Sequence, residues 1–477
     1  MTDSRELGIT KYQLFCALVG SLGSVGYGWD IGATNVPGDV ISRCITSPLH
    51  WIGPFPSCIP MSPTVWGVIV SCMPLGAMLG ALFCTPFSNR YGRKTVLAYC
   101  RVFSIIGALF LSLAVNISML VVDAYATFTA YIVEAATPKA RNVLGFLLQM
   151  GIALGIAVSQ AVSLGMSNPP YWRILFSITG VLALVNIQLL MFCVESPKWL
   201  IMKDRLELAR ESLEKLRQGA DCTAEFDQMV ADVRKEMGDG AFVANIYDVV
   251  AGRTPENLRH QLLVIVTVNF LQQSCGVGSL SFYSTSIFSS VTTGNPANIP
   301  TLAQILTSVL SLVAALATLA GVILSAYYGR RPLMLVSHGG MAIACIFIVV
   351  GTVGHINILA ITMVFVHYVA FVVGSGPIPW LTCSELTPTY AAAAFGSIGS
   401  TVNYFFMVVI GLVFPPMQSA IGGYSFVVFG ICNVFGVVFC WFLLPETKDR
   451  NTADVVRVHS VGIHNVLRQK YTVSKVL

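Results

Sequence analysis

The chain has 477 residues, of which 55% are hydrophobic and only 11% are charged. Soluble globular proteins usually carry about a quarter charged residues, so this composition excludes a soluble protein and indicates one that lies largely in a lipid bilayer. The formal net charge of +5 follows from basic residues concentrated in a few loops, and it gives no reason to expect a nucleic-acid partner.

A transmembrane helix needs roughly 20 mostly apolar residues, and twelve runs of this kind follow one another along the chain. The first six are expected over 12–35, 64–86, 95–116, 117–136, 143–166 and 172–193. The second six are expected over 260–288, 303–327, 332–353, 358–384, 395–418 and 424–444. The predicted fold is therefore an all-α membrane protein of two six-helix bundles.

Basic residues are concentrated in the loops that follow even-numbered helices, namely Arg90, Arg93, Lys94, Lys139, Arg141, Arg330 and Arg331. The positive-inside rule then places both termini and the middle of the chain in the cytosol. The first apolar run begins about a dozen residues in and lacks a small-residue cleavage site, so no removable signal peptide is expected.

A polar stretch from about Lys198 to His260 joins the two halves. Apolar residues recur in it at helical spacing, for example Leu206, Leu213 and Leu216, which predicts short amphipathic helices. This segment is either a passive tether or a latch on the cytosolic mouth, and we favour the latch. The predicted domains are a bundle over 1–196, a cytosolic linker over 197–259, a bundle over 260–448 and a tail over 449–477.

Most of the 13 cysteines lie inside apolar runs, where cysteine behaves as a small buried hydrophobe. Cys44 and Cys58 instead lie in the first exofacial loop, where they could form a disulfide or stay free. No Cys/His spacing typical of a metal site occurs, and we expect neither a metal nor a cofactor.

Three cytosolic motifs occur once in each half. Gly92-Arg93-Lys94 corresponds to Gly329-Arg330-Arg331, the segment from Glu134 to Arg141 corresponds to the segment that starts at Glu385, and Glu195-Ser196-Pro197-Lys198 corresponds to Glu446-Thr447-Lys448. A duplicated membrane bundle explains this pattern, whereas a soluble enzyme does not.

These motifs resemble those of the sugar porter branch of the major facilitator superfamily, over nearly the whole chain. Further matches are Asn89 to Lys94, Glu195 to Leu200, Gln272-Gln273-Ser274-Cys275-Gly276, Gly376-Pro377-Ile378-Pro379-Trp380 and Pro445 to Lys448. The resemblance implies a transporter rather than an enzyme, with two six-helix domains that rock around a substrate site at the bilayer midplane.

The charged motif residues are predicted to form a cytosolic gate in which arginines bridge to glutamates of neighbouring helices. The set comprises Arg90, Arg93, Glu134, Arg141, Glu195, Arg330, Arg331, Glu385 and Glu446. The alternative is positive-inside topology with arginines that reach toward lipid headgroups, which explains the basic residues but not the repeated glutamates.

Polar side chains within the apolar runs are costly in lipid and are therefore candidates for function. Amides both donate to and accept from hydroxyls, and an indole can stack on the apolar face of a sugar ring. We therefore expect a sugar to be bound by Gln149, Gln272, Gln273, Trp380 and Asn403, positions at which the resemblance also implies substrate contacts. The alternative is hydrogen bonding between helices.

Asp30 lies deep in the first predicted helix. Burial disfavours the charged form of a carboxylate, and proton-coupled members of the family carry an aspartate here. The prediction is that Asp30 takes up a proton outside and releases it inside; the alternative is a permanently charged aspartate in a wet vestibule. Arg101 could partner Asp30, but we expect its side chain to reach toward the inner headgroups.

The first half is shorter than the second between equivalent motifs. Gly92 and Glu134 are 42 residues apart, whereas Gly329 and Glu385 are 56 residues apart. In the family, the fourth helix opens with a Gly-Arg pair whose arginine faces the coupling aspartate, and no such pair occurs between 114 and 123. The chain also has Gly278 where the family usually has an asparagine.

The predicted function is transport of a hexose such as glucose, coupled to proton symport, with the sugar, the proton and the lipid bilayer as partners. We favour the plasma membrane over an internal membrane. Three alternatives stay open: a passive sugar uniporter, a sugar sensor that does not transport, and an inactive isoform with a shortened region between the third and fourth helices.

Overall fold

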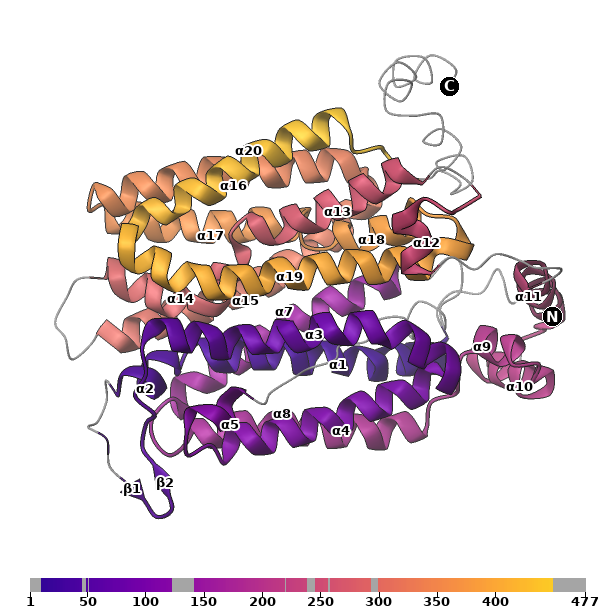
Figure 1. Ribbon diagram of the computed structural model, residues 1–477, viewed down its shortest axis with the longest axis horizontal. Helices are drawn as coiled ribbons and strands as arrows, with labels where there is room; N and C mark the ends of the chain where they lie inside the picture. Colours follow the sequence, from indigo (N-terminus) through magenta and orange to yellow (C-terminus); the bar gives the residue numbers. More distant parts are fainter. Residues whose placement is uncertain are drawn as a thin grey trace. The chain divides into compact units, whose positions relative to one another are not determined.

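The computed structural model describes residues 10–44, 49, 51–121, 141–218, 220–237, 245–255, 258–292 and 299–448. These residues are almost all helical (Figure 1), and the described strands are β1 (Trp51–Ile52) and β2 (Phe55–Pro56), which form one short antiparallel hairpin.

Ten described stretches are long and apolar enough to cross a membrane: Lys11–Asn35, Pro63–Leu82, Arg93–Ser112, Gln149–Met166, Trp172–Met191, Arg259–Val291, Leu302–Ser325, Arg330–Val353, Asn357–Cys383 and Tyr390–Phe442. The last stretch contains two helices. Each predicted span is thus matched except the one over 117–136, most of which lies outside the described residues. The prediction of an all-α membrane fold is confirmed.

The chain divides into two compact units, an N-terminal unit of Met1–Met61 with Cys72–Val243 and a C-terminal unit of Ser62–Ser71 with Ala244–Leu477. The helices described up to residue 191 are α1 (Lys11–Asn35), α2 (Gly38–Arg43), α3 (Pro63–Tyr91), α4 (Arg93–Ser112), α5 (Ile117–Val121), α7 (Arg141–Met166) and α8 (Trp172–Met191). The first turns of α3 group with the C-terminal unit.

Helices α1 and α7 touch backbone to backbone through glycines. A Cβ atom at Gly28 would lie 2.1 Å from the carbonyl oxygen of Ile152, and one at Gly155 would lie 2.2 Å from that of Val25. Small residues permit such close packing in membranes, where dispersion forces replace the hydrophobic effect between helices. This contact holds the middle of α1, which contains Asp30, firmly within the unit.

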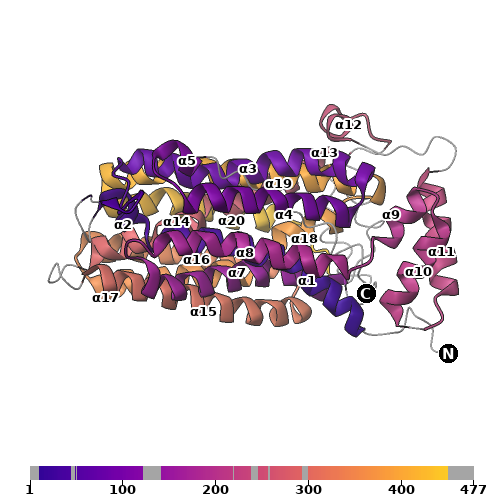
Figure 2. The same ribbon diagram turned by 90° about the horizontal axis from the view of Figure 1, so that it is seen from below.

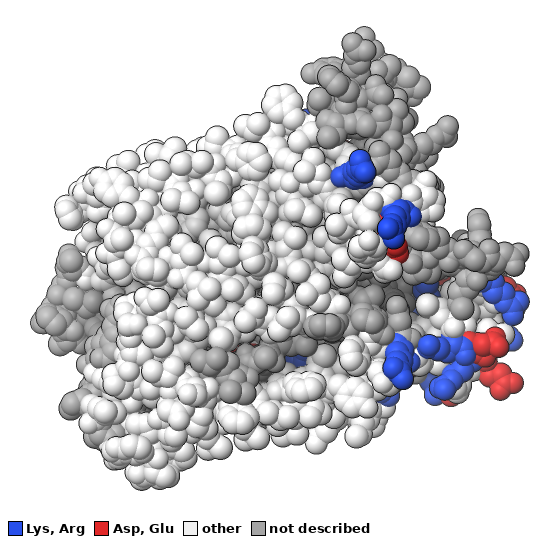
Figure 3. Space-filling view, viewed as in Figure 1, with Lys and Arg blue, Asp and Glu red and all other residues white. Residues whose placement is uncertain are grey.

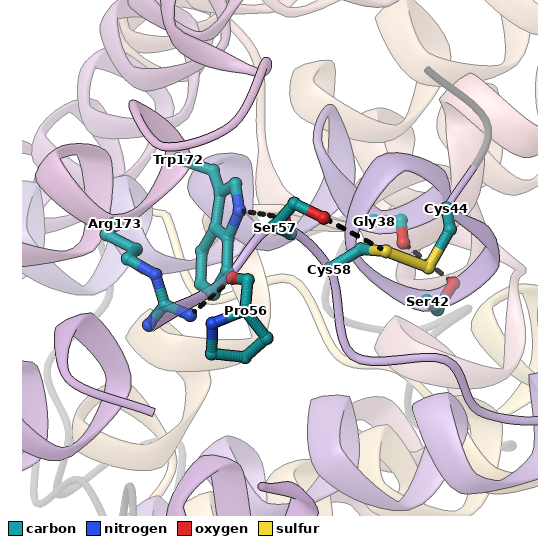
Figure 4. Close-up of a disulfide and its surroundings, with 8 residues drawn as sticks. All are labelled: Gly38, Ser42, Cys44, Pro56, Ser57, Cys58, Trp172 and Arg173. Carbon is teal, nitrogen blue, oxygen red and sulfur yellow. Dashed lines mark hydrogen bonds between the residues drawn. A yellow bond between two sulfur atoms is a disulfide. The ribbon is translucent and has the colours of Figure 1, made fainter. Parts of the chain in front are cut away.

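One end of the N-terminal unit is closed by a disulfide between Cys44 and Cys58, with the two Cα atoms 5.5 Å apart (Figure 4). The loop is anchored to the start of α8, because Trp172 Nε1 donates to the Ser57 carbonyl at 3.1 Å and Arg173 Nη2 donates to the Pro56 carbonyl at 2.9 Å. The sequence did not decide whether Cys44 and Cys58 form a disulfide, and the structure shows that they do.

At the opposite end of the same unit, α9 (Pro197–Met202), α10 (Leu206–Arg217) and α11 (Thr223–Met237) form a small helical subdomain (Figures 1 and 2). Its core includes Trp199, Ala209 and Val233. The subdomain is docked on the bundle, since Thr10 Oγ1 donates to the Leu216 carbonyl at 2.6 Å. On the face shown in Figure 3, charged side chains gather over this subdomain.

The C-terminal unit contains α12 (Ile246–Ala251), α13 (Arg259–Ser274), α14 (Val277–Val291), α15 (Ile299–Tyr327), α16 (Arg330–Val353), α17 (Asn357–Val373), α18 (Ile378–Glu385), α19 (Thr389–Ile421), the 3₁₀ turn η3 (Gly422–Tyr424) and α20 (Ser425–Phe442). Its apolar core includes Val264, Leu271, Phe395 and Phe439. Helix α19 extends beyond the predicted span of 395–418 at both ends.

Two spans of this unit are broken. The first break lies between α13 and α14 at Gly276, whose φ of 99° is a conformation that favours glycine. A Cβ atom there would also lie 2.7 Å from the Phe429 ring. The second break separates α17 from α18 at 374–377. Both breaks lie beside the polar residues described next.

Candidate functional site

The carboxylate of Glu195 binds the start of α4. Its Oε1 accepts the backbone N–H groups of Arg93 at 2.9 Å and Lys94 at 3.1 Å. The first amides of a helix lack partners within the helix and carry partial positive charge, so a carboxylate stabilises this end. A side chain at Gly92 would occupy the same space, because its Cβ atom would lie 2.5 Å from Glu195 Oε2.

Glu446 makes the equivalent contact in the C-terminal unit. Its Oε1 accepts the N–H of Arg330 at 2.9 Å, and its Oε2 accepts that of Arg331 at 3.3 Å. A Cβ atom at Gly329 would lie 2.0 Å from Glu446 Oε2. The glycine of each Gly-Arg motif therefore leaves room for a glutamate about a hundred residues away in sequence, and neither motif indicates this contact on its own.

The second basic residue of each motif binds the end of another helix. Lys94 Nζ donates to the Cys193 carbonyl at 2.7 Å, just after α8. Arg331 Nε donates to the Cys440 carbonyl at 3.3 Å, in the last turn of α20. Cations at helix C-termini complement the negative end of the helix dipole. Arg90 is exposed, and its guanidinium stacks over the neighbouring Tyr91 ring.

Arg330 also forms an ion pair with Glu385, with Nη2 2.7 Å from Oε1 and only 8% and 20% of the two side chains exposed. Thr447 Oγ1 donates to the same carboxylate. This is a predicted arginine–glutamate bridge between neighbouring helices. In the other half, Glu134 lies outside the described residues, and the side chain of Arg141 is not described.

Three amide side chains meet beside the break of α13. Gln272 Nε2 donates to the Gly376 carbonyl at 2.6 Å, and Gln272 Oε1 accepts from Asn403 Nδ2. Gln273 Nε2 donates to Asn403 Oδ1 at 3.0 Å. All three residues are less than 10% exposed. The cluster thus joins α13, α19 and the α17–α18 break, the interhelical role that the sequence left as the alternative.

One acceptor of this cluster has no partner in the described part of the chain, the Oε1 atom of Gln273. It faces Gly278, where a Cβ atom would lie 3.5 Å from it. Trp380 is half-buried, and its ring centroid lies 6.3 Å from that of Tyr404. Gln149 is half-buried on α7 in the N-terminal unit. The described residues contain no cluster of His, Cys, Asp or Glu that could hold a metal ion.

Asp30 is only 2% exposed, and its Oδ1 accepts a hydrogen bond from Thr179 Oγ1 on α8. Arg101 is also buried, with 3% of its surface exposed, and its guanidinium lies against Gly23 and Gly26 of α1. The prediction that Arg101 reaches toward the headgroups is therefore wrong. The glycines at 23 and 26 are the sequence signal that was missed, because they leave space for a large side chain.

A buried histidine network was also missed. His338 Nδ1 lies 3.0 Å from Asn433 Oδ1, which must accept, and His338 Nε2 lies 3.1 Å from Ser375 Oγ. Asn433 Nδ2 and His367 Nε2 both donate to the Cys275 carbonyl, at 3.1 and 3.0 Å. The network connects the two helix breaks, and neither histidine lies in a motif that would have revealed it.

Apolar helices of membrane-spanning length, broken beside buried amides, are the architecture of a secondary transporter. The chain belongs to the family described as Sugar (and other) transporter, whose model matches residues 16–458. The predicted membership of the sugar porter branch is confirmed, and the protein is an integral multi-pass membrane transporter rather than an enzyme.

Relatives match over most of the chain. A "Probable metabolite transport protein" of Saccharomyces cerevisiae is 28% identical, over 93% of this chain and 94% of its own length. Mouse solute carrier family 2, facilitated glucose transporter member 7, is 30% identical, over 82% of this chain and 79% of its own length. The solved proton:xylose symporter XylE bound to 6-bromo-6-deoxy-D-glucose has a TM-score of 0.75 at 19% identity, covering 93% of this chain and 98% of its own, which shows the major facilitator fold.

Proposed function

We propose that this protein carries a hexose such as glucose across the membrane by alternating access, in symport with a proton. The observation that carries the proposal is the amide cluster of Gln272, Gln273 and Asn403 at a broken helix. The hydrogen bond to Asn403 fixes the Gln273 side chain. The Oε1 atom of Gln273 accepts no hydrogen bond from the described residues. A buried acceptor without a partner costs free energy, and a sugar hydroxyl would supply the missing donor.

The other predicted substrate residues have supporting roles in this proposal. Trp380 would stack on the apolar face of the sugar ring, with Tyr404 at its side. Gly278 leaves space next to Gln273 Oε1 where a larger residue would compete with the ligand. We also propose Gln149, which is half-buried on α7, as a residue that binds sugar.

We propose Asp30 as the proton carrier. Its burial within the bundle and its contact with Thr179 support a group that can exist in both protonation states, because a hydroxyl can donate to a carboxylate and accept from a carboxylic acid. Family relatives include a protein described as a facilitated transporter and one described as a proton symporter, so coupling needs a direct test.

We propose that the charged motif residues act as a cytosolic gate, in which Arg330–Glu385 and the glutamate caps at Glu195 and Glu446 hold helix ends together within each half. The subdomain of α9–α11 would act as a latch at this end of the N-terminal unit, to which Thr10 and Leu216 join it. We place the protein in the plasma membrane, with the disulfide-closed loop outside, where oxidising conditions preserve it.

The test is uptake of labelled glucose by proteoliposomes that contain the full chain, with and without an inward proton gradient. We expect accumulation above equilibrium only with the gradient. Asp30→Asn should abolish that accumulation and retain exchange of labelled for unlabelled sugar. Uptake that reaches equilibrium but ignores the gradient would support the passive uniporter. Binding without any uptake would support the sensor, and a lack of both would contradict the proposal.

A further inference from the structure

Helix α13 ends at Ser274, one residue after Gln273, and the carbonyl of Cys275 lies at the break that follows. A carbonyl at a helix end has no donor within the helix, and a buried carbonyl without a donor costs free energy. Asn433 Nδ2 of α20 and His367 Nε2 of α17 both donate to this carbonyl, at 3.1 and 3.0 Å. Both side chains are fully buried. The break is therefore held by two other helices of the C-terminal unit.

His338 of α16 orients the Asn433 side chain. Asn433 Nδ2 faces the carbonyls of Cys275 and Phe429, at 3.1 and 2.9 Å, and a carbonyl can only accept. Asn433 Oδ1 is therefore the acceptor, and His338 Nδ1, which lies 3.0 Å from it, carries the proton that it accepts. His367 Nε2 faces a carbonyl and must also carry a proton. The two histidines thus support the same carbonyl through different ring nitrogens, His367 directly and His338 through Asn433.

We expect both imidazoles to be neutral. The sequences of α13, α14, α15, α16, α17 and α20 contain no Asp or Glu, and a buried positive charge without a counter-charge is costly. Neutral His338 then accepts at Nε2 from the Ser375 hydroxyl, 3.1 Å away. Gly436 of α20 leaves space for the ring, because a Cβ atom there would lie 2.8 Å from His338 Cγ. The ring is therefore confined to one position with both nitrogens bonded.

The same contacts reach an amide that we propose to bind sugar. Gln272 Nε2 donates to the Gly376 carbonyl at 2.6 Å, and Ser375, the residue before Gly376, bonds to His338. The backbone N–H of Ser375 also donates to Ser337 Oγ at 3.1 Å, so α16 holds the α17–α18 break at two points. The end of α13 is thus fixed both by its terminal carbonyl and by the Gln272 side chain.

We propose that His338 and His367 are positioning residues of the sugar site. Together they secure two hydrogen bonds to the Cys275 carbonyl, which fixes the last turn of α13 and with it the placement of Gln272 and Gln273. Neither histidine needs to contact the sugar, because each acts through the helix end. Sugar affinity then depends on where each ring presents its N–H group and not only on the volume of the ring. The inference rests on the proposed role of the two glutamines.

The first test measures the glucose Kd by equilibrium binding to the purified full chain. The amide nitrogen of asparagine can take the place of a histidine Nδ1, and that of glutamine the place of Nε2. His338→Asn and His367→Gln should therefore bind glucose nearly as the wild type does. His338→Gln and His367→Leu should raise the Kd about 2- to 10-fold, the effect of one lost hydrogen bond.

The control for this test is Thr318→Val on α15. Thr318 is buried and donates only to Ala314 of its own helix among the contacts described, so the Kd should stay unchanged. A merely space-filling role of the ring at position 338 would make His338→Asn and His338→Gln behave alike. That result, or a wild-type Kd in His367→Leu, would overturn the proposal.

The second test needs no sugar. The melting temperature of the purified full chain is measured for Asn433→Leu, His367→Leu and the double variant. Either single change leaves the Cys275 carbonyl one of its two donors, whereas the double variant removes both and incurs the full desolvation penalty. The loss in the double variant should therefore exceed the sum of the single losses, and additive losses would refute the shared carbonyl. A chain that binds no glucose but shows this excess would keep the shared contact and lose the proposed function. Glucose binding without the excess would keep the function and lose the inference.

Discussion

Two nitrogens of the Arg330 guanidinium donate to the Glu385 carboxylate, with Nη2 2.7 Å from Oε1 and Nε 3.2 Å from both oxygens. The same arginine gives its backbone N–H to Glu446. One residue therefore links the start of α16 to the end of α18 and to the segment after α20, and its removal should loosen all three.

Glu385→Gln should destabilise the protein because it leaves the mostly buried Arg330 charge without its counter-charge. We expect a loss of about 1–3 kcal/mol, measured as a lower melting temperature in detergent. The control is Glu214→Gln, which breaks an exposed pair with Arg210 and should change little, since exposed pairs contribute little. Equal effects of the two changes would contradict the importance of burial.

Gly329→Ala should break the cap of α16, since its methyl group would lie 2.0 Å from Glu446 Oε2. The carboxylate must move away, and the Arg330 and Arg331 amides lose their acceptor. The change should cost about 1–2 kcal/mol, as loss of a helix N-cap does. Gly339→Ala is the control, because a Cβ atom at that position on α16 meets nothing within 4 Å apart from the neighbouring backbone of its own helix. The measurement is again the melting temperature.

Gln273→Leu should weaken sugar binding by removing the amide oxygen that we assign to a hydroxyl. The loss of one hydrogen bond, about 0.5–1.5 kcal/mol, corresponds to roughly a 2- to 10-fold higher Kd. Thr401→Val on α19 is the control, because Thr401 bonds only to Ser397 of its own helix among the contacts described. A glucose Kd that stays the same in Gln273→Leu, by equilibrium binding to the purified protein, would remove Gln273 from the site.

His338→Leu should separate the two helix breaks, because Ser375 and Asn433 both lose a partner. We expect a loss of stability of about 1–3 kcal/mol, because Asn433 Oδ1 loses the imidazole donor, whereas Ser375 keeps its contact with Ser337. The expected signature is faster amide hydrogen exchange at 374–377 and around 275–276. Exchange that rises uniformly over the C-terminal unit would instead indicate a general packing defect.

Cys222, in the linker, should react slowly with alkylating agents at neutral pH. Burial, with a further contribution from the Glu225 carboxylate, raises the pKa of its thiol, so the unreactive protonated form persists above the usual thiol pKa of about 8.5. Since the folded subdomain then holds a proton that the unfolded chain releases, this thiol lowers stability as the pH rises past that value. The alkylation rate against pH, with Cys222→Ser as the blank, measures this.

The membrane fold could be predicted from the sequence because a span needs an uninterrupted apolar run of fixed length. The duplicated motifs likewise predicted that Arg330 and Glu385 would meet. The glutamate caps could not be predicted, because a carboxylate that binds backbone amides does not require any particular side chain at the partner residue. Glu195 and Arg93 are also 102 residues apart, so only the fold reveals the contact.

The site was harder to predict than the fold. The sequence indicated which amides are buried but not whether they bind one another, and the structure shows Asn403 engaged with both glutamines. Arg101 was misassigned because its position was judged from α4 alone, whereas the space that receives it belongs to Gly23 and Gly26 of α1. Such complementarity between helices is not contained in the periodicity of either one.

The glycine contact between α1 and α7 limits how this protein can move. With Gly28 against the Ile152 carbonyl and Gly155 against that of Val25, neither helix can slide or roll along the other without a backbone collision. The two helices must therefore move together as one rigid pair, and any conformational change during a transport cycle has to take place in other helices. A methyl group at either glycine would force the two helices apart.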